Sequence, residues 1–274
     1  MMPMALIRKN MRWKINQYEL YKKYGFGGNF PLFYLKEILS KNQRAKNYID
    51  FKEYYISESV FKRFGIKLDK NTPFGTIREV FEDGIYFEWP DFVPKHGDSV
   101  LDVGAQCGDY SLLSSVYHKC SNIIAIEPLP SNYNTLLKNL KMNRVSNVIP
   151  INAAASDSSG IIEIGYESDM AFKGPSKKKI DVRGIRIDDL PMKSLDLIKI
   201  DVEGFEIEVL KGAENTIKKF NPKIILETHS TGLKEKSLRF LGNLGYEMAH
   251  EGRIVRNDDS WMDSIQNLFL QKNI

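Results

Sequence analysis

The chain has 274 residues, of which 42% are hydrophobic and 27% are charged, and its formal net charge is +4. This composition is typical of a soluble globular protein and excludes a collagen-like fibre, a disordered chain and a membrane bundle. No apolar run approaches the roughly 18 residues that span a membrane, and the start lacks the apolar segment of a secretory signal. With only two cysteines, Cys107 and Cys120, no disulfide framework is expected. We therefore expect a cytoplasmic protein.

The first third of the chain is basic and aromatic. Residues 1–50 carry 10 lysines and arginines against 3 acidic residues, and residues 1–94 hold 20 of the 31 aromatic side chains. Roughly helical apolar spacing predicts helices over 1–73, and residues 74–94 are predicted to form a short hairpin that turns at 82–84. The positive charge suits a solvated helical face, with nucleic acid, an anionic membrane or an acidic glycan as alternative partners.

Strands and helices alternate from residue 97 onward. Apolar runs predict strands at 99–103, 122–127, 147–151, 161–165, 182–187, 195–201, 223–227, 246–250 and 264–271, and helices near 109–119, 131–143, 204–219 and 232–243. Repeated strand–helix units predict a doubly wound α/β fold. We expect an extension over 1–73 and one α/β domain over 74–274. The polar loop over 165–181 is expected to act as a lid, with a passive surface loop as the alternative.

A glycine-containing turn follows the first predicted strand, in LDVGAQCGDYS. Gly104 and Gly108 permit a tight turn and a close approach of backbone to a ligand, at the start of a helix. The middle glycine of the dinucleotide fingerprint G-x-G-x-x-G is absent, which argues against NAD. The loop suits a nucleoside ligand that carries an amino-acid tail.

Glu127 ends the next predicted strand, 25 residues after Asp102. In such folds an acidic residue at this position accepts hydrogen bonds from both ribose hydroxyls of a bound nucleoside. The alternative is a strand-end glutamate that faces solvent.

A set of motifs in order along the chain resembles a known family. They are LDVGAQCGDYS, AIEPLPSNYNTLLKNLKMN, NAAASDSSG, IRIDDL, DLIKIDVEGFEIEVLKGAE and PKIILETH. Together they resemble the FkbM-type S-adenosylmethionine-dependent methyltransferases over about residues 97–230, while residues 1–73 match no family. The resemblance implies a mostly parallel, seven-stranded, Rossmann-like class I methyltransferase sheet with an antiparallel last strand.

The resemblance also implies where S-adenosylmethionine binds, at the carboxyl ends of the strands. The residues implied in cofactor binding are Asp102, Gly104, Ala105, Gly108, Glu127, Pro128, Leu129, Ala153, Ala154 and Asp157. Among them, Glu127 would hold the ribose. Asp157 would accept a hydrogen bond from the adenine amine, with a plain turn residue as the alternative.

Acceptor chemistry is expected at the ends of the strands 195–201 and 223–227. There Asp201, Glu203, Glu227 and His229 are the catalytic candidates, because an alcohol acceptor needs a base to take its proton. Mg²⁺ held by Asp201 and Glu227, or a purely structural role, remain alternatives; the four histidines form no zinc-binding spacing. Glu206 and Glu208 are expected to be surface or packing residues.

The function expected from the sequence is O-methylation of a hydroxyl of a small molecule or glycan. The alternatives are N-methylation of a protein or nucleic acid and a non-catalytic binding protein on a degenerate methyltransferase fold. No nucleic-acid-binding motif favours the nucleic-acid alternative. The acceptor would be selected by residues 1–94 and 165–181, outside the cofactor motifs.

Overall fold

The computed structural model describes residues 58–168, 170–173, 176–256 and 264–273. The chain divides into two compact units, Met1–Ser59 and Val60–Ile274. The helices expected before residue 58 lie outside the described residues. Residues 60–73, which we had placed with the N-terminal extension, belong to the second unit.

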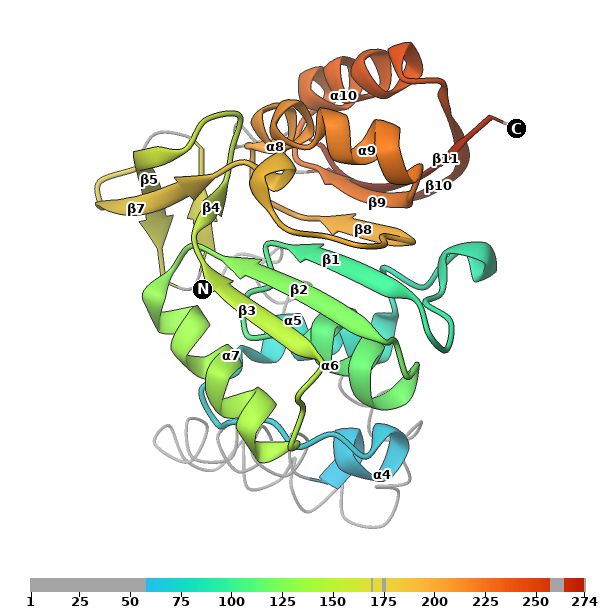
Figure 1. Ribbon diagram of the computed structural model, residues 1–274. Coiled ribbons are helices and arrows are strands. Elements are labelled where there is room, and N and C mark those ends of the chain that lie inside the picture. Colours follow the sequence, from blue (N-terminus) through green and yellow to red (C-terminus); the bar gives the residue numbers. More distant parts are fainter. Residues whose placement is uncertain (1–57, 169, 174–175, 257–263, 274) are drawn as a thin grey trace, which may run out of the picture. The chain divides into compact units, whose positions relative to one another are not determined.

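A seven-stranded sheet forms the centre of the second unit (Figure 1). Its strands lie in the order β10-β11-β9-β8-β1-β2-β3. They span β1 Ser99–Val103, β2 Asn122–Glu127, β3 Val148–Asn152, β8 Leu197–Ile200, β9 Lys223–Thr228, β10 Tyr246–Arg256 and β11 Ser264–Lys272. Neighbouring strands from β9 to β3 are parallel, whereas β11 is antiparallel to both β9 and β10. The predicted doubly wound sheet with an antiparallel last strand is confirmed.

Helices cover this sheet because its central strands are buried along their whole length. All five residues of β1 and all four of β8 are buried, which requires cover on both faces. The helices are α4 Val60–Phe64, α5 Phe74–Ile77, α6 Asp109–Leu112, α7 Pro130–Met142, α8 Glu206–Gly212, α9 Glu214–Phe220 and α10 Thr231–Asn243. One face packs its core against α8, α9 and α10 through Val209, Ile217 and Leu241 (Figure 1). Among the described residues, no helix is long and apolar enough to cross a membrane.

Four further strands form a separate small sheet in the order β4-β7-β5-β6. They span β4 Ala154–Ala155, β5 Gly160–Glu167, β6 Met170–Phe172 and β7 Lys179–Ile185. The strands predicted at 161–165 and 182–187 therefore exist but do not join the main sheet. They are partly exposed, as in an antiparallel sheet with one solvated face, and Ile161 is 74% exposed. Part of the predicted lid loop is the β5–β6 hairpin.

The hairpin predicted over 74–94 is wrong. The segment is helical: α5 continues into a π-helical turn at Arg78–Asp83, and Pro90–Phe92 is a 3₁₀ turn. Ile77, Val80 and Phe81 are buried at helical spacing. Gly84, read as a hairpin turn, has φ +61° and ends the helix in the left-handed conformation.

Candidate active site

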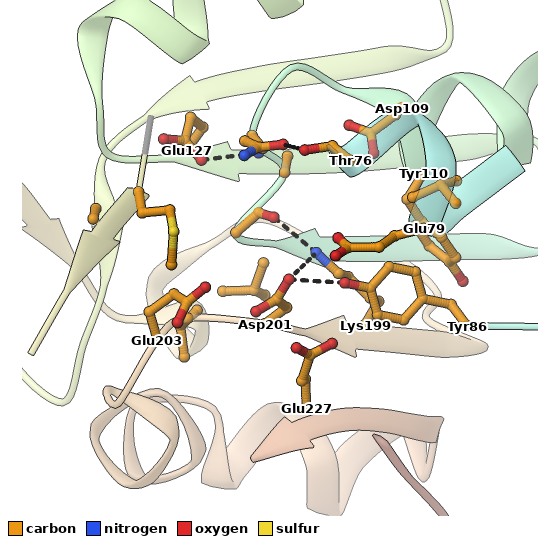
Figure 2. Close-up of a pocket in the computed structure, with 18 of the residues that line it drawn as sticks. Thr76, Glu79, Tyr86, Asp109, Tyr110, Glu127, Lys199, Asp201, Glu203 and Glu227 are labelled. Carbon is orange, nitrogen blue, oxygen red and sulfur yellow. Dashed lines mark hydrogen bonds and ion pairs between the residues drawn. The ribbon is translucent and has the colours of Figure 1, made fainter. Parts of the chain in front are cut away.

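A cavity of about 730 Å³ lies at the carboxyl ends of the parallel strands, within the range of small-molecule sites. Its walls come from the turns after β1, β2, β8 and β9, from the small sheet, and from residues 73–88 and 265–267. Figure 2 shows Glu127 on one side of this cavity and Asp201, Glu203 and Glu227 on the other. The cavity therefore joins the predicted cofactor residues to the predicted acceptor residues.

Glu127 joins the two turns of the cofactor side. Its Oε2 accepts a hydrogen bond from the Gln106 amide at 2.9 Å, and its Oε1 accepts one from the Leu129 amide at 2.9 Å and one from Asn132 at 3.2 Å. Only 4% of Glu127 is exposed, and burial raises its pKa from 4.5 to about 7 although these hydrogen bonds lower it. The carboxylate thus holds the glycine turn in place at the edge of the cavity.

The structure brings six of the ten predicted cofactor residues to the cavity wall, namely Gly104, Ala105, Glu127, Pro128, Ala153 and Ala154. The other four support the wall or lie away from it. Asp102 is fully buried beneath the turn and accepts a hydrogen bond from Ser111 at 2.6 Å. Gly108 precedes α6, Leu129 packs in the core of the small sheet, and Asp157 is exposed.

Lys199 lies inside β8 and connects the two sides of the cavity. Its Nζ donates to the Gly104 carbonyl at 2.7 Å and forms ion pairs with Asp102 at 3.3 Å and Asp201 at 3.7 Å. The ammonium also lies 5.1 Å from the centre of the Tyr86 ring. Burial opposes the charge, but the two aspartates raise the pKa of Lys199 above its usual range.

Four carboxylates surround the buried imidazole of His229 on the acceptor side. Its Nδ1 lies 2.7 Å from Glu206 Oε1, and its Nε2 lies 3.1 Å from Glu203 Oε2 and 3.6 Å from both Asp201 Oδ1 and Glu227 Oε1. Glu203 has φ +48°, a strained backbone conformation that is found mainly at functional sites. All four predicted catalytic residues thus lie together at the cavity wall.

Burial and mutual repulsion change the titration of this cluster. Burial, followed by the nearby Asp201, raises the pKa of Glu227, and burial likewise raises that of Glu203. For His229, burial opposes the charge, but the hydrogen bond to Glu206 and the other carboxylates raise its pKa. Glu206, predicted as a surface or packing residue, is fully buried and orients the imidazole.

The structure adds three residues that sequence reasoning missed: Lys199, Tyr86 and Glu206. Tyr86 donates its hydroxyl hydrogen bond to Asp201 Oδ2 at 2.8 Å, from a segment 115 residues earlier in the chain. Lys199 could have been predicted from the sequence, because a lysine within an apolar strand is buried and a buried charge needs a buried partner. No sequence spacing places Tyr86 or Glu206 in the site.

Asp109 lies in the cavity wall, and its burial should make the stability of the protein depend on pH. It is 3% exposed, and burial raises its pKa from 3.8 to about 7, opposed by a backbone hydrogen bond and by Lys199. Between these values the folded protein holds a proton that the unfolded chain has lost, so stability falls as the pH rises. We expect Asp109→Asn, which cannot ionise, to gain stability over the wild type between about pH 5 and about pH 8.

Urea unfolding at the two pH values measures this difference. Glu214→Gln, which removes an exposed carboxylate from α9, is the control and should show no such gain. If the free energy of unfolding depends on pH in the same way in wild type and Asp109→Asn, the Asp109 carboxyl does not have a raised pKa in the folded protein.

Comparisons with known proteins identify the family. The model of the methyltransferase FkbM domain matches residues 102–248, more than half of the chain. The hexuronic acid methyltransferase AglP of Haloferax volcanii is 32% identical over 145 residues, which cover 50% of this chain and 58% of AglP. The 31-O-demethyl-FK506 methyltransferase FkbM of Streptomyces tacrolimicus is 24% identical over 191 residues, which cover 56% of this chain and 73% of that enzyme.

A solved structure shows the same fold. The methyltransferase FkbM from Methylobacillus flagellatus KT superposes with a TM-score of 0.51 at 20% identity, covering 67% of this chain and 46% of that one. The match to AglP and this superposition each span less than two thirds of the other protein. The matched region contains the glycine turn, Glu127 and the acidic cluster around His229. The chain belongs to the FkbM methyltransferase domain family.

Proposed function

We propose that this protein transfers a methyl group from S-adenosylmethionine to a hydroxyl of a small molecule or glycan. The observation that carries the proposal is the placement of the partly buried cluster of Asp201, Glu203, Glu227 and His229 in the same cavity as the glycine turn and Glu127. A methyl donor and a proton acceptor can then lie on the two sides of one acceptor hydroxyl.

The cofactor would bind against the glycine turn. Glu127 faces the cavity as an acceptor for the ribose hydroxyls, and the backbone of Ala153 and Ala154 lines the wall where the adenine would lie. Gly104 and Ala105 leave room for the amino-acid tail, because their amides both donate to the Ile126 carbonyl and keep the turn tight. Family membership supports this assignment.

Methyl transfer from the sulfonium is an in-line displacement. A lone pair of the acceptor oxygen forms the new bond to the methyl carbon, the carbon–sulfur bond breaks, and its electrons stay on sulfur, which leaves neutral S-adenosylhomocysteine. The hydroxyl proton passes to the acidic cluster on the acceptor side. Alignment of oxygen, carbon and sulfur supplies much of the rate, so the cavity walls contribute to the rate by holding the acceptor in line with the methyl group.

The names of two relatives support an oxygen acceptor on a sugar acid or on a natural product. One methylates a hexuronic acid, and the other acts on the 31-O-demethyl form of FK506. We extend this acceptor class, hydroxyls on a sugar acid or on a natural product, to the present chain. The activity is tested by incubation with S-adenosylmethionine and a panel of uronic acid glycosides, with products analysed by mass spectrometry.

Calorimetric titration with S-adenosylmethionine is the companion measurement. Saturable cofactor binding with a methylated glycoside supports the proposal. A folded protein that does not bind the cofactor would instead be a non-catalytic member of the fold. If methyl groups are incorporated only into amines of protein or nucleic acid, the protein is an N-methyltransferase and not an O-methyltransferase.

Glu127→Ala is expected to weaken S-adenosylmethionine binding by about 1.5–3 kcal/mol, the usual loss for a hydrogen bond to a charged group. Isothermal titration gives the affinity and circular dichroism verifies the fold. Because Glu127 also holds two backbone amides, Glu127→Gln is measured beside it. Glu163→Ala, on the exposed surface of β5, is the control that should bind normally. Unchanged affinity in Glu127→Ala would place the ribose partner elsewhere.

A further inference from the structure

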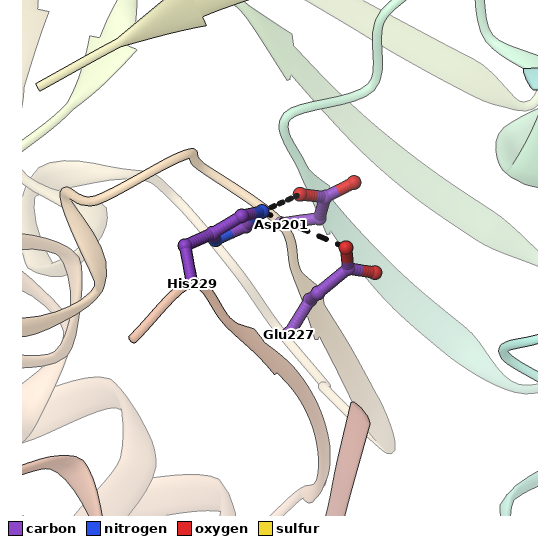
Figure 3. Close-up of side chains that lie close together, drawn as sticks. All are labelled: Asp201, Glu227 and His229. Carbon is purple, nitrogen blue, oxygen red and sulfur yellow. Dashed lines mark ion pairs between the residues drawn. The ribbon is translucent and has the colours of Figure 1, made fainter. Parts of the chain in front are cut away.

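His229 presents a buried ring nitrogen to the acidic cluster without a hydrogen bond. The side chain is 1% exposed, and its Nε2 has no hydrogen-bond partner among the described residues. Figure 3 shows this nitrogen directed at the carboxylates of Asp201 and Glu227. Carboxylate oxygens lie 3.1–3.6 Å from this nitrogen, but none is hydrogen-bonded to it, which is costly for a buried polar atom unless it serves as a ligand.

Glu206 fixes which nitrogen faces the cluster. Its Oε1 lies 2.7 Å from Nδ1, so in the neutral ring that metal binding requires, Nδ1 donates to this carboxylate and Nε2 carries the free lone pair. Histidines that bind metals show this arrangement, in which a carboxylate accepts from the other ring nitrogen.

Three donor atoms then converge on one point. Nε2 of His229 lies 3.6 Å from Asp201 Oδ1 and 3.6 Å from Glu227 Oε1, and all three donor atoms lie within 4.8 Å of one another. Ligands about 2.1 Å from a tetrahedral ion are about 3.4 Å apart. The two separations from Nε2 are close to this value, and the two carboxylate oxygens lie within 4.8 Å of each other, near enough to share one ion.

The charge of the cluster favours a cation as well. Asp201, Glu203, Glu206 and Glu227 all lie within 4 Å of the imidazole, and Lys199, which pairs with Asp201, balances one of these four charges. Oδ1 of Asp201 and Oε2 of Glu227 have no hydrogen-bond partner within the described part of the chain. A divalent ion would compensate this excess negative charge.

We propose that Asp201, Glu227 and His229 bind one divalent transition-metal ion of the Mn²⁺ or Zn²⁺ type. The donor set of one imidazole and two carboxylates distinguishes this site from a Mg²⁺ site, because Mg²⁺ takes oxygen ligands. With three protein ligands, a coordination position stays open towards the cavity.

This inference rests on the proposed function and deepens it, since the ion would bind the acceptor hydroxyl. A bound metal lowers the pKa of a coordinated hydroxyl. The hydroxyl proton then passes to the carboxylate of Glu203, while the oxygen attacks the methyl group and sulfur keeps the electrons of the broken bond. Glu203 lies 3.1 Å from Nε2 and is thus adjacent to the ion's position.

The test measures metal binding alone, without cofactor or acceptor. The full chain is treated with a chelator and titrated with MnCl₂, ZnCl₂ or MgCl₂ in a calorimeter, and the loss of the free Mn²⁺ resonance signal gives an independent affinity. We expect saturation at one ion per chain, with Mn²⁺ or Zn²⁺ bound more tightly than Mg²⁺. Glu227→Gln and Asp201→Asn should each weaken binding by more than about tenfold.

Two further variants sharpen the result. Glu206→Gln keeps the size of the side chain but removes the charge that orients His229, and should weaken Mn²⁺ binding by about 10–100-fold. Glu214→Gln, an exposed carboxylate on α9, should bind as the wild type does. Thermal unfolding in circular dichroism establishes that each variant is folded.

Absence of saturable binding, tighter binding of Mg²⁺, or equal affinities in wild type, Glu227→Gln and Asp201→Asn would overturn the site. The outcome is separable from the proposed function. If hydroxyl methylation continues in the presence of a chelator, the proposed activity stands and the metal site is rejected. If the metal binds specifically but no methyl group is transferred, the metal site stands and the proposed activity is rejected.

Discussion

Gly104→Ala should destabilise the protein by more than about 4 kcal/mol, a loss comparable with the whole stability of many domains. A methyl group at this position would lie 1.7 Å from the Asp201 carbonyl oxygen and 2.9 Å from its carbon. Both are backbone atoms at the ends of adjacent strands, so the contact is relieved only by separating β1 from β8. The φ of +78° adds strain for any residue with a Cβ.

Gly84→Ala is the matched control, because it isolates the strain from the clash. Gly84 also has a positive φ, +61°, but nothing lies within 4 Å of an added methyl group. We expect it to lose only about 1–2 kcal/mol. Urea unfolding followed by circular dichroism measures both variants. Equal losses would show that β1 and β8 can separate at this point at little cost.

Asp201→Asn is expected to reduce turnover by about 10²–10⁴-fold while S-adenosylmethionine affinity stays within about twofold. The amide oxygen can still accept from Tyr86, so the fold is retained. What is lost is the negative charge that faces His229, Lys199 and the cavity, while Lys199 keeps its hydrogen bond to the glycine turn. The kcat for the preferred acceptor and the Kd of the cofactor are measured in parallel.

His229→Ala is measured beside it, and both belong to the same cluster, so the double variant should lose little more than either alone. Asp91→Asn removes an exposed aspartate outside the cavity and serves as the control. Full activity in both Asp201→Asn and His229→Ala would move the acceptor chemistry to another part of the cavity.

The main sheet could be predicted because its strands carry their own signal. LIKI in β8 and SVLDV in β1 are continuous runs that suit burial on both faces, and turn residues bound them. The strand ends then place Asp201 and Glu227 at one edge, since parallel neighbours end together. The four catalytic candidates could therefore be placed together from the sequence.

The rest of the site depends on contacts between distant segments. Tyr86 reaches Asp201 from the turn that follows the helical segment Arg78–Asp83, in a stretch that its turn residues at 82–84 had suggested to be a hairpin. Glu206 begins α8, where an acidic residue normally faces solvent and stabilises the helix end, yet here the turn after β8 directs it inward. Local sequence cannot distinguish these two orientations.

Lys199 has a consequence for engineering. One ammonium binds the carbonyl of the glycine turn, Asp102 in the neighbouring strand β1 and Asp201 directly after β8. Grafting the acceptor-side residues of a relative onto this scaffold would therefore alter the support of the cofactor turn as well. A successful chimera has to transplant Asp102, Lys199 and Asp201 as one unit, together with the backbone of Gly104.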